Sequence, residues 1–349
     1  MIAGSIAAVA LFVSVGVVVV LWATDDSGRP QPPRLSELPS GIVNPNHGPE
    51  DGENGDGTGE NDTPGQNNAS DRGRTNFLLL GIDHNNLADA IMVGTFYREN
   101  GNIHLMSIPR DSFARLPQHR LEQMRDHGLR PPETMKINEL RSHGGRVHGI
   151  YYLKDQIAEM LGISIQFYVE VQLTAFREIV DLIGPIEMHI PGRLYYQDPT
   201  ATPPTNIDVP AGLQRLNGAM AEGVVRYRGW PMADLGRNQM QMEFMTLLIQ
   251  QLLTREALLT DPMALIGIVL TRVNSNIGAS AITYIPFIPR MSAEGIRTFT
   301  MPGTIERVQG REYFMPCTTR LPGVAADVFH YVFDAEDSAE SDESHADEE

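Results

Sequence analysis

Hydrophobic and polar positions alternate along much of this chain in patterns that predict strands followed by helices. Short apolar runs bounded by Gly, Pro, Asn or Asp are typical of strands. Apolar residues that recur every three or four positions are typical of amphipathic helices. We therefore expect strands at residues 76–82, 90–97, 103–108, 165–171 and 186–190. We expect helices at residues 149–161, 174–182 (with Thr174 as the N-cap), 217–227 and 238–253.

The connection between the second and third predicted strands refines this picture. It reads Glu99-Asn100-Gly101, and an Asn-Gly pair is a strong signal for a β-hairpin. A hairpin makes its two strands antiparallel, whereas strands that alternate with helices favour parallel pairing. No linker-like composition interrupts residues 254–333. The sequence thus predicts the α/β class, with a single α/β/α domain over residues 74–333 and a central mixed sheet.

Residues 1–24 predict a transmembrane anchor. No charged residue lies between Ile2 and Thr24, where Ile, Val, Leu and Ala dominate. A run of roughly 20 apolar residues is the length that a helix needs to cross the hydrocarbon core of a bilayer. A cleaved signal peptide is the alternative. We favour the anchor because no Lys or Arg precedes the run and Leu21-Trp22-Ala23 is a poor cleavage site.

The net charge of −17 belongs mainly to the two flanks of the predicted domain. Residues 25–72 hold ten acidic and three basic side chains, and residues 335–349 hold eight acidic side chains and no Lys or Arg. We expect residues 25–73 to be a disordered acidic linker, rich in Pro, Gly and Asn, and residues 334–349 to be a disordered tail. The remaining charges form no basic stripe, so nucleic acid is not an expected partner.

Several familiar kinds of site are absent from the sequence. There is no G-x-S-x-G, Walker A loop, H-E-x-x-H or strand-linked G-x-G-x-x-G. The single cysteine, Cys317, excludes an intrachain disulfide and a cysteine-based zinc site. His143 and His148 lie in a Gly-rich stretch without matched carboxylates, which favours a polar loop over a metal site.

Polar residues follow the predicted strands. Asp83 ends the first strand, and Asp89 comes six residues later. Two carboxylates in this arrangement can bind Mg²⁺, which prefers oxygen ligands. A capping or turn role is equally compatible with the pattern.

Cationic residues also follow the predicted elements, at Arg110, Lys136, Arg226, Arg228 and Arg237. Taken alone, Arg110 and its neighbour Asp111 are typical of a surface ion pair. On an extended segment Arg226 and Arg228 would point the same way, and Arg237 and Gln241 would share one helical face. Guanidinium groups match phosphate oxygens bidentately, so a converging set of them suits a pyrophosphate.

The same strings, in the same order, resemble the LytR-CpsA-Psr family of cell-envelope phosphotransferases. They are FLLLGID at 77–83, ADAIMV at 88–93, SIPRD at 107–111, KIN at 136–138 with GG at 144–145, FREIVDLIGPIEMHIP at 176–191, VRYR at 225–228, and DLGR at 234–237 with Gln241.

The resemblance implies a domain on the extracytoplasmic side of the cell membrane, behind one transmembrane helix, with a hydrophobic groove for a polyprenyl chain. It implies transfer of a glycopolymer phosphate from undecaprenyl pyrophosphate to a sugar hydroxyl of peptidoglycan. Asp83 and Asp89 would bind Mg²⁺, and Arg110 and Asp111 would be catalytic. The pyrophosphate would be bound by Arg110, Lys136, Arg226, Arg228, Arg237 and Gln241. Asp111 and Asp234 would orient these cations.

The sequence departs from the family pattern at three places. Asn85 stands where the family usually has Arg, Leu87-Ala88 where it has Arg-Ser, and Met240-Gln241-Met242 where it has Arg-Gln-Gln. The loss of these cations leaves a second hypothesis open, that of a non-catalytic module of the cell envelope that binds polyprenyl pyrophosphate.

Overall fold

The computed structural model describes residues 73–83, 87–201, 204–230, 234–253, 268, 271–277, 284, 287 and 290–329, without the side chains of Arg146, Val147 and Asp234. The anchor predicted at residues 1–24, the linker up to residue 72 and the tail at residues 334–349 lie outside the described residues. Among the described residues, no helix is both long and apolar enough to cross a membrane.

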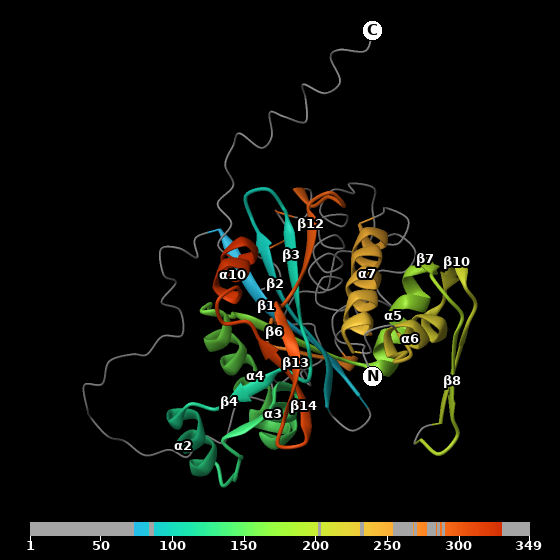
Figure 1. Ribbon diagram of the computed structural model, residues 1–349. Helices are drawn as coiled ribbons and strands as arrows, with labels where there is room; N and C mark the ends of the chain where they lie inside the picture. The colour runs from blue at the N-terminus through green and yellow to red at the C-terminus, as the bar shows by residue number, and fades with distance from the viewer. Residues whose placement is uncertain are drawn as a thin grey trace.

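A six-stranded mixed sheet forms the centre of the fold (Figure 1). Its strands, in spatial order, are β11 (Val273–Ser275), β6 (Phe167–Gln172), β1 (Arg74–Ile82), β2 (Ala88–Tyr97), β3 (Ile103–Ile108) and β12 (Ile296–Thr300). β1 runs parallel to β6 and β3 runs parallel to β12, whereas the other pairs are antiparallel. The mixed sheet predicted from the sequence is therefore confirmed.

The predicted β2–β3 hairpin is also present. The Gly101 amide donates a hydrogen bond to the Tyr97 carbonyl at 2.8 Å. Gly101 has a φ of 78°, a left-handed conformation that glycine adopts without strain.

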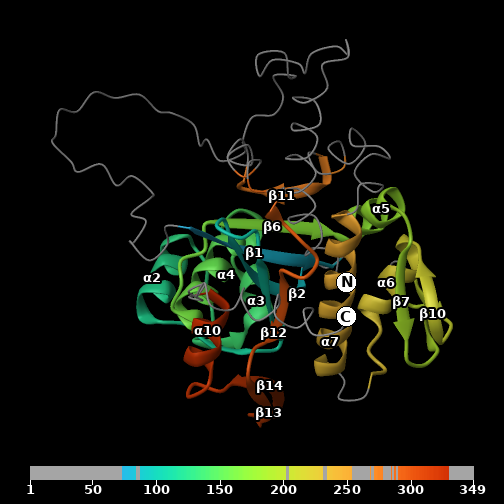
Figure 2. The same cartoon turned by 90° about the horizontal axis from the view of Figure 1, so that it is seen from above.

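Helices cover both faces of the sheet, as Figure 2 shows. Successive side chains of a strand point to opposite faces, and on β1 Phe77 and Leu79 belong to one buried cluster while Leu78 and Leu80 belong to another. The first cluster includes α5 (Leu173–Ile183), α6 (Gly218–Arg226) and α7 (Asp234–Leu252). The second includes α3 (Ile137–His143), α4 (Gly145–Leu161) and α10 (Leu321–Phe329). Burial on both faces explains the continuous apolar run of β1 and gives the expected α/β/α layers.

Two helix starts differ in how well the sequence predicted them. α6 begins after Asn217, whose side chain accepts a hydrogen bond from the Met220 amide at 2.9 Å. The predicted N-cap of α5 is wrong, because the helix starts after Gln172. Leu173 is already helical and only 2% exposed, so packing of the apolar face sets the start of α5 before Thr174.

The described structure also contains two-stranded antiparallel sheets and a further helix. The sheets are β4 (Phe113–Arg115) with β5 (Thr134–Lys136), β7 (Ile186–Ile190) with β10 (Gly212–Leu216), β8 (Leu194–Asp198) with β9 (Thr205–Val209), and β13 (Gly303–Val308) with β14 (Arg311–Pro316), and the helix is α2 (Gln118–Asp126). The β4–β5 pair brings Lys136 back beside the segment that follows β3. The β8–β9 pair packs β9 against α6.

Candidate functional site

The adjoining ends of β1 and β2 hold the two predicted metal ligands. Gly81 pairs with Ala90 and Ile82 pairs with Ala88, so Asp89 is the extra residue of a β-bulge. Bulges re-aim side chains at functional sites. Asp83 directly follows β1, and both aspartates are buried, at 6% and 2% exposure.

Asp83 closes the turn that follows β1. Its Oδ1 atom accepts a hydrogen bond from the Leu87 amide at 2.6 Å, and its own amide donates to the Leu87 carbonyl at 3.0 Å. The turn role considered from the sequence is therefore real. It uses Oδ1 as an acceptor from a backbone amide, which does not prevent the carboxylate from also binding a cation.

Asp89 lies among arginines. Arg110 Nη1 donates to Asp89 Oδ1 at 2.5 Å, and Arg228 Nη2 lies 3.9 Å from Asp89 Oδ2. Oδ2 is buried and accepts no hydrogen bond from the residues that the structure describes. A buried carboxylate oxygen without a hydrogen bond is unfavourable. This atom is therefore suited to a ligand that the protein alone does not supply, such as a metal ion.

Asp111 connects Arg110 to Lys136. Its Oδ2 atom accepts a hydrogen bond from Lys136 Nζ at 2.8 Å, and its Oδ1 atom lies 3.6 Å from Arg110 Nε. The backbone fixes the same contact, since the Asn138 amide donates to the Arg110 carbonyl at 3.2 Å. The structure thus places Asp111 where it can orient both cations.

The arrangement of Arg226 and Arg228 corrects the extended segment expected from the sequence. Arg226 is the last residue of α6, and the backbone becomes extended only at Tyr227, which has a φ of −59° and a ψ of 132°. The helix forms because buried apolar residues continue to Val225. Burial lowers the pKa of Arg226, while the charges of Asp89 and Asp83 act in the opposite direction. Both arginines therefore lie within electrostatic reach of Asp89, although Arg226 is helical.

Arg237 and Gln241 lie one turn apart on α7, and both are buried, at 1% and 2% exposure. Gln241 Nε2 donates to the Val225 carbonyl at 3.3 Å, which ties α7 to the end of α6. Their role in binding pyrophosphate stays a prediction. So does the orienting role of Asp234, whose side chain lies outside the described part of the structure.

The sequence analysis missed the partners of Arg226. Arg226 Nη1 donates to Glu222 Oε1 at 2.5 Å, and Nη2 donates to Thr205 Oγ1 at 2.9 Å. The four-residue spacing of Glu222 and Arg226 in a predicted helix was a usable signal for the first contact. Nothing local in the sequence indicates the second, because it depends on how β9 packs against α6.

The two aspartates can be tested for fit to Mg²⁺. Within the described residues, no group of three or more His, Cys, Asp or Glu side chains is placed to hold a metal ion. Mg²⁺ keeps several waters and is often held by one or two carboxylates together with substrate phosphates. Two buried aspartates, one with a buried oxygen that accepts no hydrogen bond in the described structure, fit that pattern.

Comparison with known proteins identifies the family. The model of the LytR_cpsA_psr family matches residues 48–327, which is most of the chain. The chain belongs to the LytR-CpsA-Psr family.

Individual relatives match a smaller region. The probable cell wall biosynthesis protein LcpB of Corynebacterium glutamicum is 33% identical over 161 residues, which is 46% of this chain and 33% of that protein. The polyisoprenyl-teichoic acid–peptidoglycan teichoic acid transferase TagT of Bacillus subtilis is 26% identical over 192 residues, 52% of this chain and 54% of TagT. The matches thus span from a third to about half of the length of these relatives.

A solved structure supports the fold. The structure of TagT bound to LIIa-WTA has a TM-score of 0.59 and 23% sequence identity, and the match covers 74% of this chain and 91% of that one. At this identity the likeness establishes the fold of the LytR-CpsA-Psr family and nothing about the ligand of this chain.

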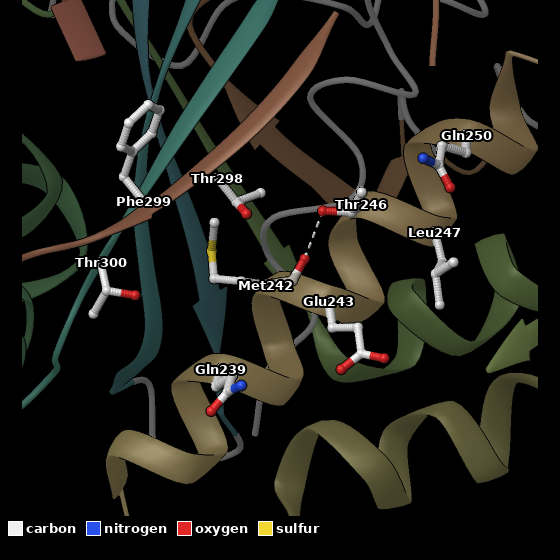
Figure 3. Close-up of a pocket in the computed structure, with 9 residues that line it drawn as sticks. All are labelled: Gln239, Met242, Glu243, Thr246, Leu247, Gln250, Thr298, Phe299 and Thr300. Atoms are coloured by element: carbon white, nitrogen blue, oxygen red, sulfur yellow. Dashed lines mark hydrogen bonds between the residues drawn. The ribbon is translucent and has the colours of Figure 1, made fainter. Parts of the chain in front are cut away.

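A cavity of about 410 Å³ lies between α7 and β12 (Figure 3). Its lining consists of Gln239, Met242, Glu243, Thr246, Leu247, Gln250, Thr298, Phe299 and Thr300. Three of these side chains, Met242, Leu247 and Phe299, are apolar, and the others are polar or charged. A lining that mixes apolar and polar side chains does not by itself identify the groove that the family resemblance implies. That groove stays a prediction.

Proposed function

We propose that this member of the LytR-CpsA-Psr family transfers a glycopolymer phosphate from an undecaprenyl-pyrophosphate carrier to a sugar hydroxyl of peptidoglycan. The observation that carries the proposal is the buried Asp89 carboxylate, bound by Arg110 and approached by Arg228. Its second oxygen is left without a hydrogen bond in the described structure. This combination of fixed cations and an available carboxylate oxygen suits a metal-bound pyrophosphate.

The reaction needs positioning and neutralisation of charge more than covalent chemistry. The acceptor hydroxyl oxygen forms a bond to the phosphorus of the glycopolymer phosphate. The bond from that phosphorus to the bridging oxygen breaks, undecaprenyl phosphate leaves, and the hydroxyl proton is released. Arg110, Arg226 and Arg228 would stabilise the negative charge that shifts onto the phosphate oxygens. Asp111 would keep Arg110 and Lys136 in place during this step.

Asp83 and Asp89 would hold Mg²⁺ in this proposal. The ion would supply further neutralisation of the pyrophosphate oxygens when it is bound. The support for it is the buried Asp89 oxygen described above and the position of Asp83 at the adjoining strand end.

The cellular setting is part of the proposal. The apolar residues 1–24 would anchor the chain in the cell membrane as a single pass and place the domain on the extracytoplasmic side. There it would meet the polyprenyl-pyrophosphate-linked glycopolymer and the peptidoglycan acceptor. The relatives support this setting, since TagT is named as a peptidoglycan teichoic acid transferase and LcpB as a probable cell wall biosynthesis protein.

A turnover assay tests the proposal. The full chain, reconstituted in detergent micelles, is given undecaprenyl pyrophosphate with Mg²⁺ or with EDTA. Water takes the place of the sugar hydroxyl in this assay, and release of undecaprenyl phosphate and inorganic phosphate is followed. We expect release only with Mg²⁺. In a separate incubation, undecaprenyl phosphate replaces undecaprenyl pyrophosphate as the control compound, because it lacks the second phosphate.

The second candidate function is a non-catalytic module that binds polyprenyl pyrophosphate. Met240 and Met242 favour it, because they replace polar family residues and are buried in the apolar cluster between the sheet and α7. They provide no donor for a phosphate. Binding of undecaprenyl pyrophosphate without turnover under any metal condition would support this function and contradict the first.

A further inference from the structure

Glu222 is a buried carboxylate that lies between two arginines. It is 3% exposed and sits on α6 one turn before Arg226. Its Oε1 atom accepts the hydrogen bond from Arg226 Nη1 at 2.5 Å, and its Oε2 atom accepts one from Arg177 Nε on α5. Both oxygens of this carboxylate are therefore engaged by guanidinium groups.

These contacts fix the orientation of Arg226. Its side chain is only 12% exposed, and a guanidinium buried to this degree is strongly unfavourable without a counter-charge. Glu222 holds Nη1, and Thr205 of β9 holds Nη2. Because separate groups hold the two ends of the planar fork, rotation of the guanidinium is restricted. Only two of the five N–H groups of an arginine are used in these bonds, which leaves donors for a ligand.

Arg177 reaches the same carboxylate from α5. The two helices pack closely, since Asp181 Oδ1 accepts a hydrogen bond from the Gly218 amide at 2.7 Å. A Cβ atom at Gly218 would lie 2.4 Å from the Arg177 carbonyl oxygen. Burial lowers the pKa of Arg177, and the positive charge of Arg226 lowers it further, while the negative charge of Asp181 acts in the opposite direction.

The two arginines differ in exposure. The Arg177 side chain is 47% exposed, against 12% for Arg226. The charge of Asp181 on α5 offsets part of the positive charge of Arg177, and the more exposed arginine presents its guanidinium group to solvent. Arg177 shares Glu222 with Arg226, on which the charge of Asp89 acts.

We propose that Glu222 is the positioning residue that fixes Arg226 for the pyrophosphate, and that Arg177 is a further binding residue for an anionic oxygen of the lipid-linked substrate. The inference rests on the proposed function, because it assumes a pyrophosphate at the Asp89 site. It assigns Arg177 a role that offsets part of the cations missing at Asn85, Leu87 and Met240.

Calorimetric titration of the full chain in detergent micelles with farnesyl pyrophosphate tests this inference. The variants are Glu222→Gln, Glu222→Asp and Arg177→Gln. Arg307→Gln is the matched control, because Arg307 is 67% exposed and pairs with Glu312 on the β13–β14 hairpin. We expect Glu222→Gln to weaken binding roughly tenfold or more, since hydrogen bonds to charged groups contribute ~1.5–3 kcal/mol. Glu222→Asp should restore part of the affinity, because it keeps the charge.

Arg177→Gln should weaken binding roughly three- to tenfold and reduce its salt dependence, because an exposed charge acts through a screened interaction. In the turnover assay this variant should raise KM and leave kcat nearly unchanged, as for a residue that binds ground state and transition state equally. A purely structural role for Arg177 would lower thermal stability without this selective rise in KM.

A double-mutant cycle separates positioning from folding. If Glu222 acts through Arg226, the loss in the Glu222→Gln/Arg226→Gln pair should be clearly smaller than the sum of the single losses. Additive losses would overturn the positioning role. Should Glu222→Gln fail to fold, Arg177→Gln and Glu222→Asp still test the inference.

Two failures are distinguishable in these data. If the wild-type chain does not bind farnesyl pyrophosphate at all, the proposed function fails and Arg177 loses its assigned ligand. If the wild-type chain binds but Arg177→Gln and Glu222→Gln behave like Arg307→Gln, the inference fails and the proposed function stands.

Discussion

Two buried ion pairs at the central sheet have similar chemistry but different surroundings. In the first, Arg141 Nε on α3 donates to Glu170 Oε1 on β6 at 2.5 Å. In the second, Arg110 Nη1 donates to Asp89 Oδ1, also at 2.5 Å. The side chains of the first pair are 5% and 6% exposed, and those of the second are 16% and 1% exposed.

The difference between the pairs lies in their remaining atoms. Glu170 Oε2 accepts hydrogen bonds from Arg141 Nη2 at 3.3 Å and from Asn274 Nδ2 at 2.6 Å, while Arg141 Nη1 donates to the Gly145 carbonyl at 3.0 Å. Every polar atom of this first pair is therefore satisfied within the protein. Asp89 Oδ2, by contrast, accepts no hydrogen bond within the described residues. We call an ion pair satisfied when all its polar atoms have hydrogen bonds, and open when one of them has none. A satisfied buried pair is typical of a structural role, whereas an open one is typical of a binding site.

The largest effect on stability should come from breaking the satisfied pair. Arg141→Ala would leave Glu170 as a buried charge without its main partner, and such a change costs about 3–5 kcal/mol. Urea denaturation of the full chain measures this loss. Arg193→Ala is the control, because Arg193 and Asp208 form an exposed pair, with side chains 62% and 46% exposed, and such pairs contribute ~0–1 kcal/mol. Equal losses in the two variants would contradict the structural role of Arg141.

Breaking the open pair should affect turnover more than stability. We expect Arg110→Ala to lower the rate of undecaprenyl phosphate release by roughly 10²–10³-fold, as does loss of a donor that stabilises charge in a transition state. The free energy of unfolding should fall by only ~1–2 kcal/mol, because Arg228, 3.9 Å from Asp89, remains as a second counter-charge. A loss of stability as large as that of Arg141→Ala, with turnover preserved, would make both pairs structural.

The sequence predicted the open pair better than the satisfied one. The run NFLLLGI is apolar on both faces, so β1 was predictable, and the aspartates at its end followed from it. Arg141 and Glu170 are 29 residues apart, so only the packing of α3 on β6 reveals their contact. A family string thus names residues, such as those proposed to bind a ligand, but does not show which of them contact each other in the fold.

The bulge at Asp89 was not predictable for a different reason. The register of β2 against β1 depends on pairing along the whole strand, which no local pattern specifies. The helix that ends at Arg226 is stabilised by the burial of Val224 and Val225 against the sheet-side cluster. The helix predicted at residues 217–227 is therefore confirmed, and the extended conformation expected between the two arginines is limited to Tyr227.

The proposed Mg²⁺ site also includes Asp83, which can be tested separately from the ion pair of Asp89. Asp83→Asn keeps an acceptor for the Leu87 amide but removes the negative charge, so the turn should persist. We expect the Mg²⁺ concentration for half-maximal turnover to rise by roughly tenfold or more, since loss of even an outer-shell partner weakens metal binding by about 10–100-fold. Titration of turnover with Mg²⁺ measures this shift. An unchanged Mg²⁺ response would leave Asp83 with the turn role alone.

The smallest effect should come from a change at Asp111, whose ion pairs with Lys136 and Arg110 are only partly buried. Its side chain is 25% exposed, and it bonds Lys136 at 2.8 Å while lying 3.6 Å from Arg110. Asp111→Asn keeps an acceptor but loses the charge that attracts both cations. Because partly exposed pairs contribute ~0.2–1 kcal/mol, turnover should fall only about 1.5- to 5-fold. Initial rates measured beside Arg110→Ala test this ranking. A loss larger than that of Arg110→Ala would mean that Asp111 acts on the reacting groups directly, because an orienting carboxylate can remove no more than the contribution of the arginine that it holds.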